Sequence, residues 1–173
     1  ESQSRIYETQ LARSRPFTDW LFGQMKDSFG DLGVADSDAF YRAVNSVKNG
    51  FIRTEADELQ YNLHIMLRYD LERALISGDL RVNDLEAAWN DRFLADFGYA
   101  VPKASLGMLQ DIHWSECLIG YFPTYAIGNI YAACLREAML KDAPNAIDEL
   151  SEGRTDTARN WLQENVQRHG CRY

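Results

Sequence analysis

The segment EADELQYNLHIMLRYDLERALIS, residues Glu55–Ser77, decides the fold class, because its apolar residues recur at three- and four-residue steps. That period places an apolar stripe along one side of a helix, which can then pack on a hydrophobic core. The stripe consists of Leu59, Leu63, Met66, Leu67, Leu71, Ala74 and Leu75. The letters TEAD at 54–57 have the form of a capping box, and Gly78 is a typical helix-ending residue. The sequence therefore predicts a helix over 55–77.

Similar periodicity predicts helices along most of the remaining chain. Pro16 suits the start of a helix, and Gly98 and Gly170 suit helix ends. The predicted helices are Glu1–Arg13, Phe17–Phe29, Asp38–Val47, Val82–Phe97, Pro123–Lys141 and Thr155–His169. Strand-like composition is confined to at most two short segments, 50–53 and 117–121. We therefore expect an all-α fold, with no repeat or linker that would divide residues 1–173 into domains.

Composition excludes several classes of protein. The 173 residues are 46% hydrophobic, enough for a substantial core. The net charge of −8 comes from acids scattered among Arg and Lys, whereas a nucleic-acid-binding protein needs a basic face. No apolar run approaches the roughly 20 residues of a membrane span. Because Cys117, Cys134 and Cys171 are odd in number and form no CxxC pair, we expect a reducing, cytoplasmic location.

Polar and aromatic residues crowd together in GMLQDIHWSECLIGYFPTY, residues 107–125. Simple amphipathic packing does not require this mixture, and loops of such composition often carry function. The groups with useful chemistry are Gln110, Asp111, His113, Trp114, Tyr121 and Tyr125. On spacing alone, His113 is either a functional imidazole or a structural histidine that donates to a backbone carbonyl. We assign Trp114 to packing.

A second polar group occupies IRTEADELQYNLH, residues 52–64. Arg53 precedes a helix, on which Asp57, Tyr61 and His64 follow one another at i, i+4 and i+7. An arginine in this place can bind a carboxylate with two parallel hydrogen bonds, with Asp57 as its orienting partner. The alternative is a capping and ion-pair arrangement that only fixes the start of the helix.

Histidine spacing argues against a metal site complete within the chain. Catalytic zinc usually has three protein ligands, and the chain has only three histidines, His64, His113 and His169. None of them lies in HxxxH or HExxH spacing. The sequence also lacks a GxSxG nucleophile motif and a glycine-rich phosphate loop.

Three short motifs occur in a fixed order: ESQSR at 1–5, IRTEAD at 52–57 and GMLQDIHW at 107–114. They resemble signature motifs of the carboxypeptidase Taq family, zinc metallocarboxypeptidases of the HExxH type. GYFPTY at 120–125 and RHGCRY at 168–173 also resemble the C-terminal region of that family. The HExxH motif, with two zinc histidines and the general base, is absent. The resemblance therefore implies the C-terminal part of a larger, mainly helical metallopeptidase.

The resemblance also implies roles for single residues. Glu1 matches the glutamate that serves as third metal ligand, for zinc or for cobalt or another divalent metal. Arg53 would bind the C-terminal carboxylate of the peptide, and Asp57 would orient Arg53.

The loop residues would serve the reaction itself. His113 resembles the histidine with which related HExxH peptidases stabilise the tetrahedral oxyanion, and Tyr121 or Tyr125 would donate a further hydrogen bond. Gln110 and Asp111 would hold the metal ligands or the His113 loop in place.

The function implied is metal-dependent release of C-terminal amino acids from peptides by metal-activated water, in a full-length enzyme that is a homodimer. The chain alone, with one metal ligand, is expected to be inactive and to bind zinc weakly. The alternative is a non-catalytic helical interaction module or remnant derived from such an enzyme.

Overall fold

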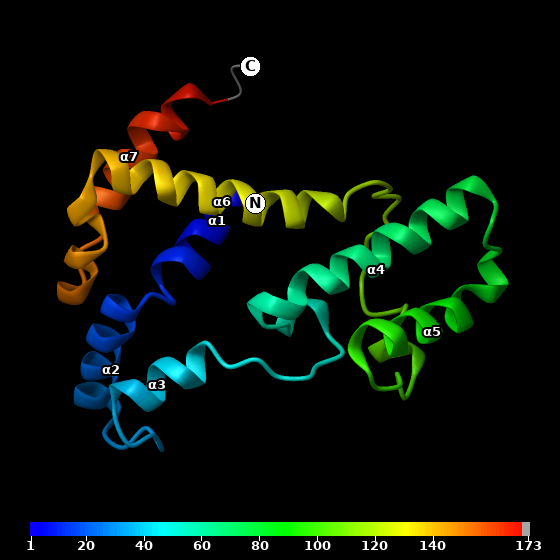
Figure 1. Cartoon of the computed structure of the whole chain (residues 1–173), viewed down its shortest axis with the longest axis horizontal. Helices are drawn as coiled ribbons and strands as arrows, with labels where there is room; N and C mark the ends of the chain where they lie inside the picture. The colour runs from blue at the N-terminus through cyan, green and yellow to red at the C-terminus, as the bar shows by residue number, and fades with distance from the viewer. Residues whose placement is uncertain (171–173) are drawn as a thin grey trace. The chain divides into compact units, whose positions relative to one another are not determined.

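The computed structural model describes residues 1–170, and in this range the chain forms helices and turns but no strand (Figure 1). The α-helices are α1 (Ser2–Arg5), α2 (Arg15–Phe29), α3 (Ser37–Val44), α4 (Glu58–Ser77), α5 (Leu85–Phe97), α6 (Pro123–Asp142) and α7 (Asp156–Asn165). A π-helical segment, Ile6–Leu11, continues α1. The predicted all-α fold is confirmed, and the two segments considered as short strands, 50–53 and 117–121, are turns and loops. Cys171 lies outside the described residues.

Short 3₁₀ turns connect or extend the helices. They are Arg53–Glu55, Val82–Asp84, Ala104–Leu106, Pro144–Ala146, Asp148–Glu152 and Gln167–His169. The predicted helix ends at Gly78 and Gly98 are confirmed, because both glycines adopt the left-handed conformation that terminates α4 and α5.

The chain divides into two compact units. Unit 1 combines Glu1–Ser46 with the chain from Gly128 onward, and unit 2 is Val47–Ile127. Unit 1 is held by a core in which the π-helical segment and α6 meet the C-terminal turns and α7. That core consists of Ile6, Leu11, Ala132, Met139, Ala146, Leu150, Ala158 and Leu162. The organisation of residues 1–173 as a single functional region stays a prediction.

Unit 2 is built on the pairing of α4 with α5 (Figure 1). Its main core consists of Leu67, Leu71, Leu85, Trp89 and Phe93. Phe93 stacks on Phe97 with ring centroids 4.2 Å apart. A second, smaller cluster brings Phe122, just before α6, against Tyr61 and Ile65 of α4. The second cluster anchors the 107–125 segment on α4.

The start and the buried face of α4 differ from the prediction. Asp57 rather than Thr54 caps the helix, accepting a hydrogen bond from the Gln60 N–H at 2.8 Å. Leu59 and Met66 of the predicted stripe are 71% and 51% exposed. The buried face instead includes three polar residues in one row: His64, Arg68 and Glu72.

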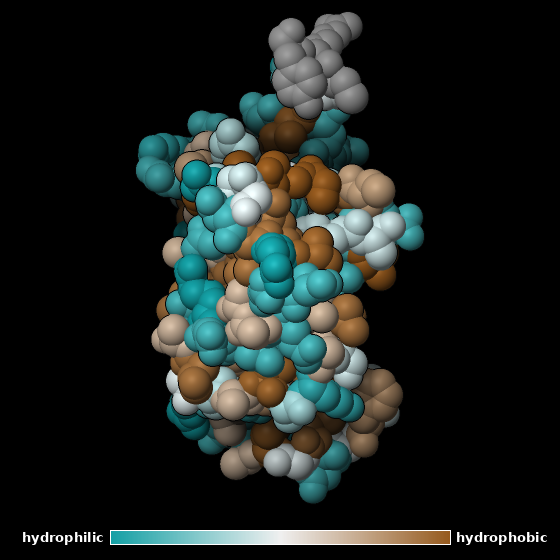
Figure 2. Space-filling model, turned by 90° about the vertical axis from the view of Figure 1, so that its right-hand side faces the viewer, coloured by the Kyte–Doolittle hydropathy of each residue, from teal (hydrophilic) through white to brown (hydrophobic). Residues whose placement is uncertain are grey.

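On the face shown in Figure 2, hydrophobic and hydrophilic residues are interspersed. Among the described residues, no helix has both the length and the apolar character needed to cross a membrane.

Candidate functional site

Arg53 is fixed by its backbone as well as by its side chain. Its N–H donates to the side-chain oxygen of Gln110 at 2.8 Å, and the Gln110 amide donates to the Phe51 carbonyl at 2.9 Å. The same amide also reaches the carbonyls of Leu106 and Gly107 at 3.1 Å. Gln110 therefore joins the Arg53 turn to the loop that leads to His113.

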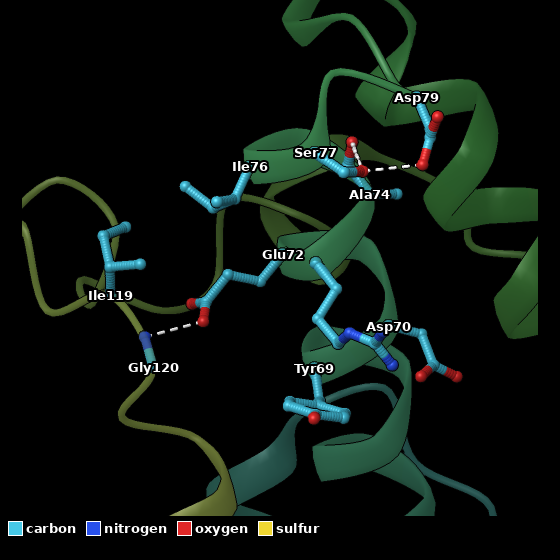
Figure 3. A pocket seen from close by; sticks show the side chains of 10 residues that line it. Tyr69, Asp70, Glu72, Ala74, Ile76, Ser77, Asp79, Ile119 and Gly120 are labelled. Atoms are coloured by element: carbon cyan, nitrogen blue, oxygen red, sulfur yellow. Dashed lines mark hydrogen bonds between the residues drawn. The ribbon is translucent and has the colours of Figure 1, made fainter.

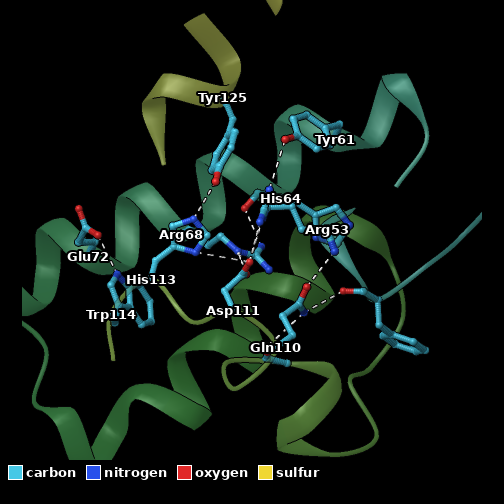
Figure 4. A network of polar contacts seen from close by, with 12 residues as sticks. Arg53, Tyr61, His64, Arg68, Glu72, Gln110, Asp111, His113, Trp114 and Tyr125 are labelled. Atoms are coloured by element: carbon cyan, nitrogen blue, oxygen red, sulfur yellow. Dashed lines mark hydrogen bonds and ion pairs between the residues drawn. The ribbon is translucent and has the colours of Figure 1, made fainter. Parts of the chain in front are cut away.

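Asp111 lies between two arginines (Figure 4). Its Oδ1 accepts from Nε and Nη2 of Arg53 at 3.0 and 2.8 Å, and its Oδ2 accepts from Nε of Arg68 at 2.6 Å. Arg53 and Arg68 are 5% and 0% exposed. We call these three residues the Asp111 cluster; with two cations and one anion it carries a net positive charge.

Burial and charge act in opposite directions in the Asp111 cluster. Burial alone would raise the pKa of Asp111, but the positive charges of Arg68 and Arg53 outweigh it and lower that pKa. Burial lowers the pKa of Arg68 to about 10, and Asp111 opposes the fall. All three groups are therefore charged at neutral pH.

His113 contacts both the Asp111 cluster and a tyrosine. Its Nε2 is 2.9 Å from the hydroxyl of Tyr125, and its Nδ1 is 3.7 Å from Oδ1 of Asp111. The imidazole tautomer decides which member of the His113–Tyr125 pair donates. Burial, aided by the charges of Arg53 and Arg68, lowers the pKa of His113. The ring is thus neutral at pH 7.

These side chains line one cavity of about 410 Å³ in unit 2. Its walls are Arg53, Thr54, Gln110, Asp111, Ile112, His113, Leu118, Tyr121 and Tyr125. The Arg53 guanidinium lies 4.6 Å from the Tyr125 ring centre, and Tyr121 is 41% exposed at the surface. Arg53 and the His–Tyr pair line this cavity, and the buried Arg68 offsets the charge of Asp111 from outside it, so the cavity suits a ligand with a carboxylate beside a polarised oxygen.

The predicted partner of Arg53 is corrected by the contacts. Asp57 accepts hydrogen bonds from the backbone N–H groups of Lys48 and Gln60, so it fixes the start of α4. The carboxylate on Arg53 is Asp111, 58 residues further along the chain. Arg68 was also missed in the sequence analysis. The one sign of its burial in the sequence is its place on the face of α4 that bears the buried Ile65 and Leu71.

Glu1 lies in unit 1, at the start of α1. Its side chain rests against Gly128 of α6, where an added Cβ would come within 2.7 Å of the Glu1 Cγ. Arg5 of α1 donates to the side-chain oxygen of Asn129, the next residue of α6. The two contacts fix Glu1 on α6.

A complete metal site is not formed by this part of the chain. Across residues 1–170, no three His, Cys, Asp or Glu side chains gather as metal ligands. Glu1 supplies one ligand, whereas a catalytic metal usually has three protein ligands. The described residues therefore do not fit a self-contained metal centre.

His64 is fully buried beside the Asp111 cluster, and within residues 1–170 neither ring nitrogen has a hydrogen-bond partner. Its ring packs on Phe97 with centroids 4.6 Å apart. Burial, reinforced by the charges of Arg68 and Arg53, lowers the pKa of His64 from 6.5 to about 4. The ring is therefore neutral in the folded protein at pH values well above 4.

This pKa predicts acid sensitivity. Below pH 6.5 the unfolded chain binds a proton that folded His64 cannot, so the free energy of unfolding falls as the pH drops toward 4, by about 3 kcal/mol. Urea unfolding at pH values from 8 to 4 should show this loss. His64→Phe should flatten the curve, whereas replacing exposed His169 with Gln should not. An unchanged acid slope in His64→Phe would contradict the assignment.

Comparison with known proteins agrees with these features. The family model for Carboxypeptidase Taq (M32) metallopeptidase matches residues 1–173. Carboxypeptidase 1 of Bacillus subtilis is 39% identical over 99% of this chain, and thermostable carboxypeptidase 1 of Pyrococcus furiosus is 38% identical over 100% of it. The M32 carboxypeptidase structure from Deinococcus radiodurans superposes with a TM-score of 0.92 at 40% identity, covering 99% of this chain and 35% of that one.

The chain spans about a third of the curated relatives, 34% and 35% of their lengths. The match nevertheless extends over every motif that predicted the family, from ESQSR to the loop bearing His113. The chain belongs to the carboxypeptidase Taq (M32) family of metallopeptidases.

Proposed function

We propose that the protein is a metal-dependent carboxypeptidase, in which this chain supplies the groups that bind the peptide C-terminus. The observation that carries the proposal is the Asp111 cluster, which presents a fixed arginine to a cavity that also contains His113 and Tyr125. Carboxypeptidases must distinguish a free terminal carboxylate from an internal peptide bond. A buried cation with unused donors is suited to that task.

Arg53 can bind a second carboxylate without releasing the first. Asp111 and Tyr61 accept from three of its five N–H donors, at 2.8 to 3.3 Å. The remaining donors of a guanidinium that lines the cavity are available to the substrate. Asp111 keeps the plane of the guanidinium fixed, so little side-chain entropy is lost when the substrate binds.

His113 and Tyr125 are proposed to stabilise the oxyanion that forms at the scissile carbonyl. They already form a hydrogen-bonded pair at 2.9 Å beside the cavity that Arg53 also lines, so both groups are held close to a substrate that binds there. Tyr121, the more exposed of the two tyrosines, is proposed as a further donor.

Glu1 is proposed as one ligand of a catalytic divalent metal, with zinc as the metal and cobalt as an alternative. This rests on the family and on the motif ESQSR. We further propose a cytoplasmic homodimer. Sedimentation of the full-length protein and fractionation of the source cells test the two parts of that proposal separately.

Gly128→Ala tests the position of Glu1. The new methyl group would come within 2.7 Å of the Glu1 Cγ and displace the carboxylate from α6. After dialysis, we expect the full-length variant to retain at most about a tenth of the metal that the wild type retains, because one ligand is misplaced. Elemental analysis measures the metal content. Gly23→Ala, in α2 with no atom within 4 Å of the new Cβ, is the matched control and should bind metal normally. Equal metal content in the two variants would refute the role of Glu1.

The activity is tested on the full-length protein with divalent metal and an unstructured peptide. Mass spectrometry should show a ladder of products shortened from the C-terminus, which disappears with a chelator or with a C-terminally amidated peptide. Absence of metal-dependent trimming would reject the enzyme and favour a non-catalytic helical module.

A further inference from the structure

Glu72 is a buried carboxylate on α4 that the proposed chemistry does not use. It is 5% exposed and lies one helical turn beyond Arg68, on the same face. Its Oε2 accepts from the indole N–H of Trp114 at 2.7 Å (Figure 4), and its Oε1 accepts from the backbone N–H of Gly120 at 2.6 Å (Figure 3). One side chain thus binds two points of the 107–125 segment.

The two points are the ends of one loop, Trp114–Gly120. Within and beside the loop, the N–H groups of Cys117 and Leu118 donate to the carbonyls of Trp114 and His113 at 3.2 and 2.8 Å. The backbone is left-handed at Cys117 and Gly120, with φ of 57° and 76°. Because such turns are costly for a non-glycine residue, the loop needs outside contacts to keep its shape.

The residues on either side of the loop are those proposed for the oxyanion. His113 directly precedes Trp114, and Tyr121 directly follows Gly120 and leads into the first turn of α6, which holds Tyr125. Fixing both ends of the loop therefore fixes the distance between His113 and Tyr125.

We propose that Glu72 is a positioning residue, which holds His113 and the tyrosines at the spacing that the oxyanion requires. The inference rests on the proposed carboxypeptidase function and adds a residue to it. A carboxylate suits the place because both partners are donors and both of its oxygens accept. Glutamine would direct an NH₂ group at one of the two donors, so Glu72→Gln is a disruptive change despite its similar shape.

Two measurements on the full-length protein test this role. Amide hydrogen exchange of Glu72→Gln should be faster across residues 112–121 and unchanged in α5. Steady-state kinetics should show kcat at least about tenfold lower with KM changed by less than about threefold, because Arg53 still binds the substrate while the transition state loses its donors. Trp114→Phe, which removes only the indole donor, should change both quantities in the same direction.

Glu86→Gln is the matched control, since Glu86 is exposed on α5. It should leave exchange and kinetics as in the wild type. The proposal is overturned if Glu72→Gln leaves exchange at 112–121 unaltered, or if KM rises by as much as kcat falls. A wild-type protein without activity would reject the carboxypeptidase proposal instead, and exchange alone would then decide the role of Glu72.

Discussion

Replacing Asp111 with asparagine is expected to lower the free energy of unfolding by about 3–5 kcal/mol, the usual cost of removing one partner from a buried ion pair. Two guanidiniums, one of them 0% exposed, would lose their shared counter-charge. The asparagine amide would also direct N–H donors at the donors of one arginine. Equilibrium urea unfolding, followed by circular dichroism, measures the loss.

Asp84→Asn is the control, because Asp84 pairs with Arg81 at the surface, where the side chains are 53% and 77% exposed. Surface pairs contribute about 1 kcal/mol or less, so this variant should stay close to the wild type. Combining Asp111→Asn with Arg68→Met should recover part of the stability, since one unpaired buried cation is removed. If Asp111→Asn costs no more than Asp84→Asn, the Asp111 cluster does not stabilise the fold as described.

The sequence predicted the helices well because their signals are local. Gly78 and Gly98 end α4 and α5 where expected, and Pro16 lies in the first turn of α2. The cap of α4 was misplaced because Thr54 and Asp57 are both good capping residues three positions apart. Arg53–Glu55 form a 3₁₀ turn before the helix, which leaves the capping position to Asp57.

The site was only partly predictable because its contacts span distant parts of the chain. Arg53, Gln110, Asp111, His113 and Tyr125 were singled out by motif and composition, and the structure brings them to one cavity. Which carboxylate meets Arg53 depends on tertiary packing, and helical spacing favoured the nearer Asp57. Periodicity alone assigns an arginine and a glutamate on a helix to solvent.

Arg68 and Glu72 are buried because loop groups more than 40 residues away satisfy them: Asp111 for Arg68, and Trp114 and Gly120 for Glu72. No window of the sequence around α4 contains those partners. The burial of polar residues along one face of α4 can therefore be recognised only from the tertiary structure, which shows the loop that covers them.

Arg53→Lys is expected to lower kcat/KM of the full-length enzyme by about 100-fold or more. Lysine keeps the charge but cannot hold Asp111 through two nitrogens while presenting further donors to a substrate carboxylate. Losing one or two charge-assisted hydrogen bonds of about 1.5–3 kcal/mol each accounts for an effect of this size. Initial rates on a peptide with a free C-terminus, over a range of concentrations, measure it.

A pair of ligands separates loss of recognition from loss of folding. A dipeptide product and its C-terminal amide differ only in the carboxylate, so the wild type should bind the acid about 100-fold more tightly in competition assays, and Arg53→Lys should bind the two almost equally. Arg81→Lys, at an exposed position, should keep the wild-type ratio. The ratio of the two affinities depends on the cation that contacts the carboxylate. If a folded Arg53→Lys protein still prefers the acid to the amide, a group other than Arg53 recognises the peptide C-terminus.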